Sequence, residues 1–219
     1  MTGLSPLIDS SVLREMLDYP GPPNKLPEVN FTDAKEDSAC LKDFFDMLYG
    51  RDIVVKSLLF EGRVWNTVDF FRKYDCSRLC KVLRDEIKLE LAVGESPTSS
   101  GKAYMLGVYM DDIGICIEAL RRGFGKRYHK VERNSDEATV DDYLEGISFF
   151  EPGGMPARYI DSCPGRYVVA LMRANQKLAA EGKRDRAEAA RIVANEFRRI
   201  MHLVSTLPCC HMRKSAHSA

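Results

Sequence analysis

The residues best suited to nucleophilic chemistry are seven cysteines and four histidines. A nucleophile needs a base within reach and usually a glycine-assisted turn that exposes it. No G-x-S-x-G motif is present, and His129 is the one histidine that lies before the C-terminal helices and tail expected below. The sequence therefore does not favour acyl transfer.

Cysteine and histidine side chains also bind zinc, and Cys209, Cys210 and His211 are adjacent. Adjacent residues rarely coordinate one ion together, and Cys76 and Cys80 would supply only two of four ligands. Their spacing instead fits packing in the core of a helical protein. We therefore predict no metal site and no cofactor, and we expect the cysteines to be reduced, buried thiols.

Acidic pairs and glycine clusters offer no clearer chemistry. The segments RRGFGKR and EPGGMP lack the spacing of a phosphate-binding loop. Neighbouring acids do not face each other on a helix, and they are typical of helix caps and solvated faces. Such pairs occur at Asp111–Asp112, Asp141–Asp142 and Asp85–Glu86. We predict no catalytic residues and hence a protein that is not an enzyme.

The charge balance bears on possible partners. Lys+Arg and Asp+Glu number 32 each, so the whole chain does not favour a polyanionic partner. The C-terminal part is basic, and the alternative function is a helical nucleic-acid-associated protein that uses Arg166 to Lys214. Acidic residues are interleaved with these arginines, which favours a solvated, ion-paired face instead.

No long apolar run and no signal peptide are visible, so we expect no membrane partner and a location in the cytoplasm or nucleus.

The elements that would position these residues begin with the stretch SSVLREMLDYPGPP, which has apolar residues at helical spacing before a proline-glycine stop. A short strand candidate, LPEVNF at 26–31, follows. The segment SACLKDFFDMLYG predicts a helix with Asp37 or Ser38 as its cap and Gly50 as its stop. Residues 51–59 are ambiguous between a strand and a helical turn.

Two antiparallel helices come next, because VWNTVDFFRKYD and CSRLCKVLRDEIKLEL each place apolar residues on one side. The first side comprises Val64, Trp65, Val68, Phe71 and Tyr74, and the second comprises Leu79, Leu83, Ile87 and Leu91. Asp75 or Ser77 is the predicted cap of the second helix.

The remaining chain predicts a linker and a helical region. Residues 94–102, GESPTSSGK, have a linker composition. A break near Asp111, Asp112 and Gly114 predicts two short helices, and two longer amphipathic helices turn at Gly182. The predicted organisation is 1–93, a helical unit with a small sheet; 94–102, a linker; 103–207, an all-helical region; and 208–219, a disordered tail.

This order of elements resembles the later part of the BTB/POZ domain, in the divergent form abundant in basidiomycete fungi. In that family a helix with a serine and an arginine-methionine segment packs under a sheet. A strand, a helix ending in leucine-tyrosine-glycine, and a helix pair with tyrosine-aspartate in its turn follow. The matching residues are Ser11, Arg14 and Met16; Leu48, Tyr49 and Gly50; and Tyr74 and Asp75. The resemblance covers roughly Leu4 to Leu91, and the helical stretch beyond the linker is similar to the extension that often follows such domains.

The resemblance implies a mostly α fold of the α+β class: a truncated BTB/POZ-like helical unit with a small residual sheet, followed by an all-helical region. The family's domain opens with a β-hairpin and a helix that precede the position of Ser11. The chain is then either a truncated product or gene-model fragment, or a domain completed in another way. Because the family commonly dimerises through that missing region, dimerisation of the family type is in doubt.

The function that the resemblance implies is a non-enzymatic protein–protein interaction module. Such a module would act as a substrate adaptor for cullin-type ubiquitin ligases or as a scaffold in transcription. Partners would be a cullin scaffold, contacted around Tyr49 to Lys56, or a second copy of the chain. The candidate interaction residues are Val12, Leu13, Met16, Leu17, Phe44, Phe45 and Tyr49. We expect the first four, on the opening helix, to be partly uncovered.

Overall fold

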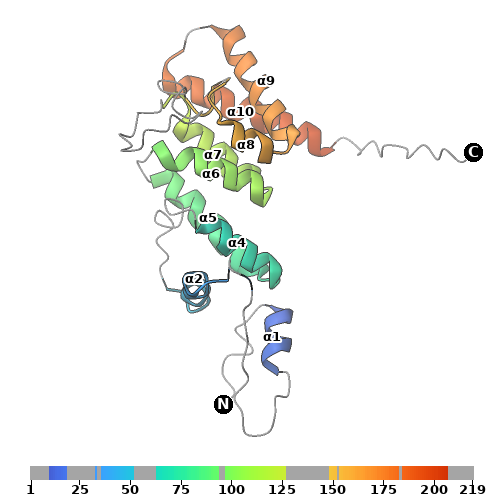
Figure 1. The fold of residues 1–219 in the computed structure, drawn as a ribbon. Helices are drawn as coiled ribbons and strands as arrows, with labels where there is room; N and C mark the ends of the chain where they lie inside the picture. The colour runs from blue at the N-terminus through green and yellow to red at the C-terminus, as the bar shows by residue number, and fades with distance from the viewer. Residues whose placement is uncertain are drawn as a thin grey trace, which may run out of the picture. The chain divides into compact units, whose positions relative to one another are not determined.

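The structure is a computed structural model, and it is mostly helical over the residues that it describes. Those residues are 10–18, 33, 36–51, 63–93, 97–126, 148–151, 153–182 and 184–206. Their helices are α1 (Ser11–Asp18), α2 (Ser38–Leu48), α4 (Val64–Lys73), α5 (Ser77–Val93), α6 (Pro97–Met110), α7 (Ile113–Gly123), α8 (Ala157–Ser162), α9 (Gly165–Glu181) and α10 (Arg186–Thr206). The prediction of a mostly α protein is confirmed, and the helices can be followed along the chain in Figure 1.

The small residual sheet stays a prediction. The strand candidate at 26–31 and nearly all of the ambiguous segment at 51–59 lie outside the described residues. Within the described ranges no strand occurs, and Ser148 alone has the geometry of a β-bridge. The predicted disordered tail, 208–219, also lies outside them.

Two compact units make up the chain, with the division after Gly123. In the first unit, α4 and α5 are joined by a short turn in which Asp75 has a φ of 50°. Aspartate tolerates this left-handed conformation better than most residues, so it supplies the geometry of the turn. The α5 residues Leu79, Leu83, Ile87 and Leu91 are all buried, as their spacing predicted.

The helices α6 and α7 pack closely in the first unit, and their break falls where the sequence predicted it. Asp111 has a φ of 54°, and the Asp112 side chain accepts a hydrogen bond from Ile115 N at 3.1 Å, which caps α7. A Cβ at Gly107 would lie 2.7 Å from Cys116 Sγ and 2.9 Å from Cys116 N. Only glycine therefore allows the two helices to approach this closely.

Side chains of α4 and α5 hold the C-terminal end of α6. Arg72 of α4 donates to the Tyr109 carbonyl at 2.7 Å, and Arg84 of α5 donates to the Met110 carbonyl at 3.3 Å. These carbonyls lack partners within the helix, and cations are favoured there by the helix dipole. Lys88 also pairs with Asp112 at 3.0 Å. The pair α6–α7 is thus joined to α4–α5.

This junction differs from the predicted organisation, which began a separate helical region after residue 102. The segment 94–102 was expected to be a linker, but α6 already begins at Pro97. Proline suits the first helical position, because an N–H at that position would have no partner within the helix. The composition of the segment therefore indicated a linker where proline in fact begins a helix. The first compact unit accordingly continues to Gly123 instead of ending at residue 93.

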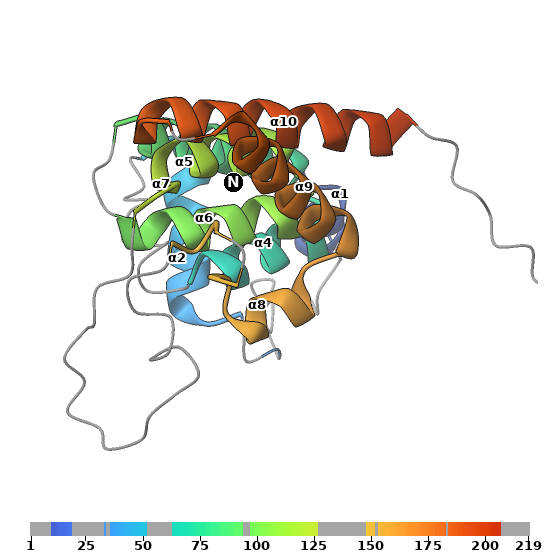
Figure 2. The same ribbon diagram turned by 90° about the horizontal axis from the view of Figure 1, so that it is seen from above.

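The second unit is formed around α9 and α10, which are both seen in Figure 2. The chain turns between these two helices at Gly182, which has a φ of 84°. Tyr167 and Phe197 meet across the two helices with ring centroids 6.3 Å apart. The buried Asn175 donates to the Phe150 carbonyl at 2.9 Å and so ties the segment before α8 to α9. The predicted turn between two long helices is confirmed.

Candidate protein-interaction surface

The helix α2 is fixed in place by capping at both ends. Asp37 accepts a hydrogen bond from Cys40 N at 2.7 Å, which selects Asp37 rather than Ser38 as the cap. At the other end Gly50 has a φ of 65°; its N–H bonds the Met47 carbonyl, and the Arg51 N–H bonds the Asp46 carbonyl at 2.7 Å. This paired arrangement is a Schellman motif, and it turns Arg51 back toward α2.

Phe44 belongs to the inner face of α2, which differs from its predicted role in partner binding. Its side chain is buried, and its ring centroid lies 5.3 Å from that of Phe70 and 6.3 Å from that of Phe71. Adjacent residues on a helix point about 100° apart, so Phe44 is buried while its neighbour Phe45 is exposed. Phe44 anchors α2 to α4.

Phe45 and Tyr49 are the exposed aromatic residues of α2, at 45% and 48% exposure. Their rings are stacked, with centroids 6.4 Å apart and an interplanar angle of 20°. The Arg51 guanidinium lies 5.8 Å from the centre of the Tyr49 ring. We call Lys42, Phe45, Asp46, Tyr49 and Arg51 the α2 surface.

The charges of the α2 surface centre on Asp46. Lys42 Nζ lies 2.5 Å from one of its carboxylate oxygens, and Arg51 Nη1 lies 3.3 Å from the other. The hydrogen bond from Lys42 holds the pKa of Asp46 below its ordinary value, with a further contribution from Arg51. Two cations and one carboxylate therefore surround a stacked aromatic pair.

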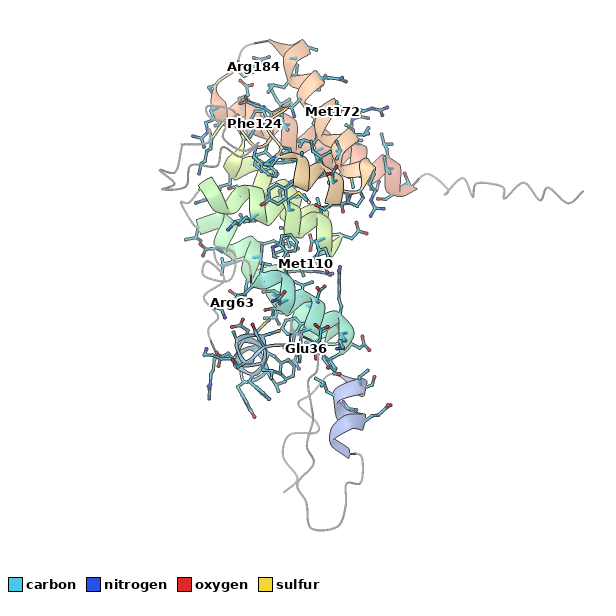
Figure 3. All side chains as sticks on the ribbon, in the orientation of Figure 1. Glu36, Arg63, Met110, Phe124, Met172 and Arg184 are labelled. Carbon is cyan, nitrogen blue, oxygen red and sulfur yellow. The ribbon has the colours of Figure 1, made fainter. Side chains whose placement is uncertain are left out.

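On the buried side of the same helix, Asp43 faces Arg63, with Nη1 and Oδ2 3.4 Å apart. Burial raises the pKa of Asp43, and the nearby guanidinium opposes that rise. Arg63 is labelled in Figure 3.

The opening helix is only partly as predicted. Val12 is exposed, at 37%, but Leu13 is buried and does not belong to an uncovered patch. The start of α1 is attached to the turn between α4 and α5. Ser10 is buried, its hydroxyl accepts a hydrogen bond from Leu13 N at 3.0 Å, and it donates one to the Tyr74 carbonyl. Ser10 rather than Ser11 is thus the serine that attaches α1 to the α4–α5 turn. The side chains of Met16 and Leu17 lie outside the described residues.

Sequence reasoning missed Glu36, which is labelled in Figure 3. This carboxylate is buried and accepts from Tyr74 Oη at 2.9 Å and from Lys73 Nζ at 2.5 Å. Burial raises its pKa, but the hydrogen bonds from Lys73 and Tyr74 outweigh burial, so the pKa lies below the ordinary value. Glu36 stands one residue before the capping aspartate, and no periodicity marks it. Its role depends on a contact with a distant turn.

Trp65 is also placed differently from its prediction. It is half-buried, and its ring centroid lies 5.3 Å from that of Tyr109, an exposed residue of α6. Tyr109 also donates to Asp69, and the Arg72 guanidinium lies 4.7 Å from its ring centre. Trp65 therefore attaches α4 to α6 instead of lying in the core of the helix pair.

The five cysteines that the structure describes have buried side chains: Cys40, Cys76, Cys80, Cys116 and Cys163. Burial raises the pKa of Cys40 and of Cys163 to about 11. A thiol with such a pKa is almost entirely protonated at neutral pH and is a poor nucleophile. The prediction of buried cysteines is confirmed for these five, while Cys209 and Cys210 lie outside the described residues.

Over the described ranges, no group of three or more His, Cys, Asp and Glu side chains is placed to hold a metal ion. Among the helices that the structure describes, none combines the length and the apolar character needed to cross a membrane.

Comparison with family models, with curated proteins and with solved structures gave no match in any of the three cases.

Proposed function

We propose that this chain is a non-enzymatic protein–protein interaction module of BTB/POZ type, which acts as an adaptor for a cullin-type scaffold through the α2 surface. A scaffold role in transcription would use the same surface with another partner. The observation that carries the proposal is the stacked, half-exposed pair Phe45 and Tyr49 on a helix that is capped at both ends.

The residue types of the α2 surface suit protein recognition. Tyrosine and arginine are enriched among residues that dominate binding energy. A tyrosine side chain buries a large area with two rotatable bonds, and a guanidinium offers several hydrogen-bond donors in a fixed plane. The Phe45 ring contacts that of Phe44, with centroids 5.2 Å apart, and Phe44 packs on α4. A prearranged surface loses less conformational entropy when a partner binds.

The order of the described elements also supports the family in the proposal. Helix α1 starts at a serine, α2 ends in leucine-tyrosine-glycine, and α4 and α5 are joined at Tyr74 and Asp75. Ser10, at the start of α1, contacts the Tyr74 carbonyl, so the first and last of these segments meet. Motifs far apart in sequence would have to meet in this way if they form one domain.

The nucleic-acid alternative receives less support from the basic helices. In α10, Arg191 lies 3.8 Å from Glu188, and Arg199 lies 2.6 Å from Glu196. Arginines that already pair with carboxylates gain less from phosphate contacts. Retention of the chain on nucleic acid at low salt, with loss at higher salt, would favour the alternative.

The test is a binding experiment with a purified cullin as the probe. The native chain and the double variant F45A/Y49A are each immobilised, and the cullin retained is measured. We expect retention by the native chain and loss by the variant. Because both side chains are exposed, the variant should unfold at nearly the same temperature as the native chain.

The matched control is Met172→Ala, which truncates an apolar side chain of similar exposure on α9 in the second unit. Its cullin retention should equal that of the native chain. If the native chain retains no cullin, the adaptor proposal fails. If F45A/Y49A retains as much cullin as the native chain, the α2 surface is not the binding site.

A further inference from the structure

The cations of the α2 surface are exposed, whereas its carboxylate is covered. The side chains of Lys42 and Arg51 are 72% and 71% exposed, and the side chain of Asp46 is 15% exposed. The two cations bind different oxygens of the same carboxylate and so shield it from solvent. A partner that approaches α2 therefore meets two cations and little of the carboxylate.

The charge of this cluster is unbalanced. Two cations share the single carboxylate of Asp46, which leaves one positive charge in excess. Among the residues that the structure describes, neither Lys42 nor Arg51 forms an ion pair with a second carboxylate. A further carboxylate, supplied by a partner, would bring the cluster to neutrality and would be attracted by both cations.

Two rows of side chains run side by side along α2, each with steps of four and three residues. Lys42, Asp46 and Tyr49 form one row, and Leu41, Phe45 and Leu48 form the other. Steps of this size keep side chains on one face of a helix. In the second row, Phe45 is exposed and the two leucines are half-buried. The charges of α2 therefore lie beside an apolar row, and a partner that covers both rows needs acidic side chains next to apolar ones.

We infer that the partner segment bound by the α2 surface is acidic and amphipathic. Its apolar side chains cover Phe45 and Tyr49, and one of its carboxylates contacts Lys42 and Arg51. A basic segment would be repelled by the two exposed cations. The inference rests on the proposed function, because it names the chemistry of the partner at the same surface.

Single-stranded nucleic acid is the other acidic polymer that binds aromatic rings and cations. Its affinity comes largely from the number of phosphates that are neutralised, and the α2 surface offers two cations with a carboxylate between them. The apolar row of α2 has no counterpart in a phosphate backbone. These features favour a protein segment over nucleic acid.

The test uses synthetic probes, so it does not depend on a cullin. Backbone amide signals of the isotope-labelled full chain are followed by NMR during titration with a copolymer of glutamate and tyrosine. A copolymer of lysine and tyrosine is the probe of opposite charge. We expect the acidic copolymer to shift the signals of the α2 surface, and the basic copolymer to leave them unchanged.

Three variants determine the sign of the charge effect. K42Q/R51Q should bind the acidic copolymer at the α2 surface at least about tenfold more weakly than the native chain. Asp46→Asn should bind it at least as tightly, because the change removes a negative charge and keeps an acceptor oxygen. The matched control Arg173→Gln, which removes an exposed arginine of α9, should bind at the α2 surface like the native chain.

The inference is overturned if the acidic copolymer leaves the α2 signals unchanged, or if the basic copolymer shifts them. It is also overturned if K42Q/R51Q binds as tightly as the native chain, or if Asp46→Asn weakens binding as much as K42Q/R51Q does. A single-stranded oligonucleotide that shifts the α2 signals at lower concentration than the acidic copolymer would replace the protein segment by nucleic acid.

Failure of this inference differs from failure of the proposed function. If the acidic copolymer binds at the α2 surface but the native chain retains no cullin, the acidic chemistry of the partner stands and the adaptor role fails. If a cullin is retained through Phe45 and Tyr49 and K42Q/R51Q retains it equally, the adaptor role stands and the inference fails.

Discussion

At the scale of single residues, a buried carboxylate joins three segments of the first unit. Glu36, ahead of α2, binds Lys73 and Tyr74 at the end of α4, and the Tyr74 carbonyl in turn accepts from Ser10 at the start of α1. A buried acceptor that loses its donors retains the cost of desolvation, so each contact depends on the others. Glu36 thus connects the opening helix, through the turn, to α2.

Replacing this carboxylate should destabilise the native chain in a pH-dependent way. Glu36→Gln should lower the free energy of unfolding at neutral pH by about 1.5 to 3 kcal/mol, the usual contribution of hydrogen bonds to a charged group. The folded-state pKa of Glu36 lies below its ordinary value of 4.5, so its stabilisation is present above that value and is lost as the pH falls through the folded-state pKa.

Urea unfolding at several pH values measures this effect. The difference in the free energy of unfolding between the native chain and Glu36→Gln should shrink as the pH falls. Tyr74→Phe should lower the free energy of unfolding by about 1 kcal/mol, because it removes one hydrogen bond and keeps the ring. A constant difference between native chain and Glu36→Gln at all pH values would contradict the role of the ionised carboxylate.

At the scale of helices, the close approach of α6 and α7 depends on Gly107. In an open helix position, Gly→Ala stabilises a protein by up to about 1 kcal/mol. Here the added Cβ would meet backbone and side-chain atoms of Cys116, so we expect Gly107→Ala to destabilise the chain by about 1 to 3 kcal/mol.

Thermal unfolding checks this prediction against Gly165→Ala, which introduces a Cβ with no neighbouring atom within 4 Å. The control should unfold at or slightly above the native temperature. A Gly107→Ala variant as stable as the control would mean that the two helices can separate without loss.

The sequence predicted elements well where one helix buries one face. The inner side of α5, the Asp37 cap, the break before α7 and the turn at Gly182 all follow from local chemistry that periodicity and capping residues record. Each depends on residues within a few positions of one another.

The sequence predicted the burial of side chains and the start of α6 less well, because these depend on contacts between residues far apart in the chain. Leu13 and Phe44 were expected on a binding surface, yet both are buried. Phe44 packs against Phe70, and Ser10, which accepts a hydrogen bond from Leu13 N, donates one to the Tyr74 carbonyl. The first turn of α6 was expected to be a linker, because its proline, threonine and serines are typical of linkers in composition. Of the α2 surface, the pair Phe45 and Tyr49 was predicted, and the stacking and the Arg51 contact were not.

At the scale of the whole molecule, the division after Gly123 predicts which fragments of the chain fold cooperatively. The first unit includes α6 and α7, whose apolar residues are buried on nearly every side. A fragment 1–123 should therefore unfold cooperatively in urea. A fragment 1–93 should lack a cooperative transition, because the α5 face that contacts α7 is left uncovered.

Circular dichroism during urea titration compares the two fragments. Equal cooperativity of 1–93 and 1–123 would contradict the division and favour the boundary that the composition of 94–102 predicted. The fragment 124–219 provides an independent reference for the second unit.

The central claim is that the stacked pair of α2 binds a cullin-type partner, and calorimetric titration of a purified cullin into the native chain tests it most directly. We predict saturable binding that Tyr49→Phe largely retains and that F45A/Y49A weakens about thirtyfold or more, as expected when side chains that contribute about 2 kcal/mol are removed. Absence of binding by the native chain, or equal affinity of F45A/Y49A, would contradict the claim.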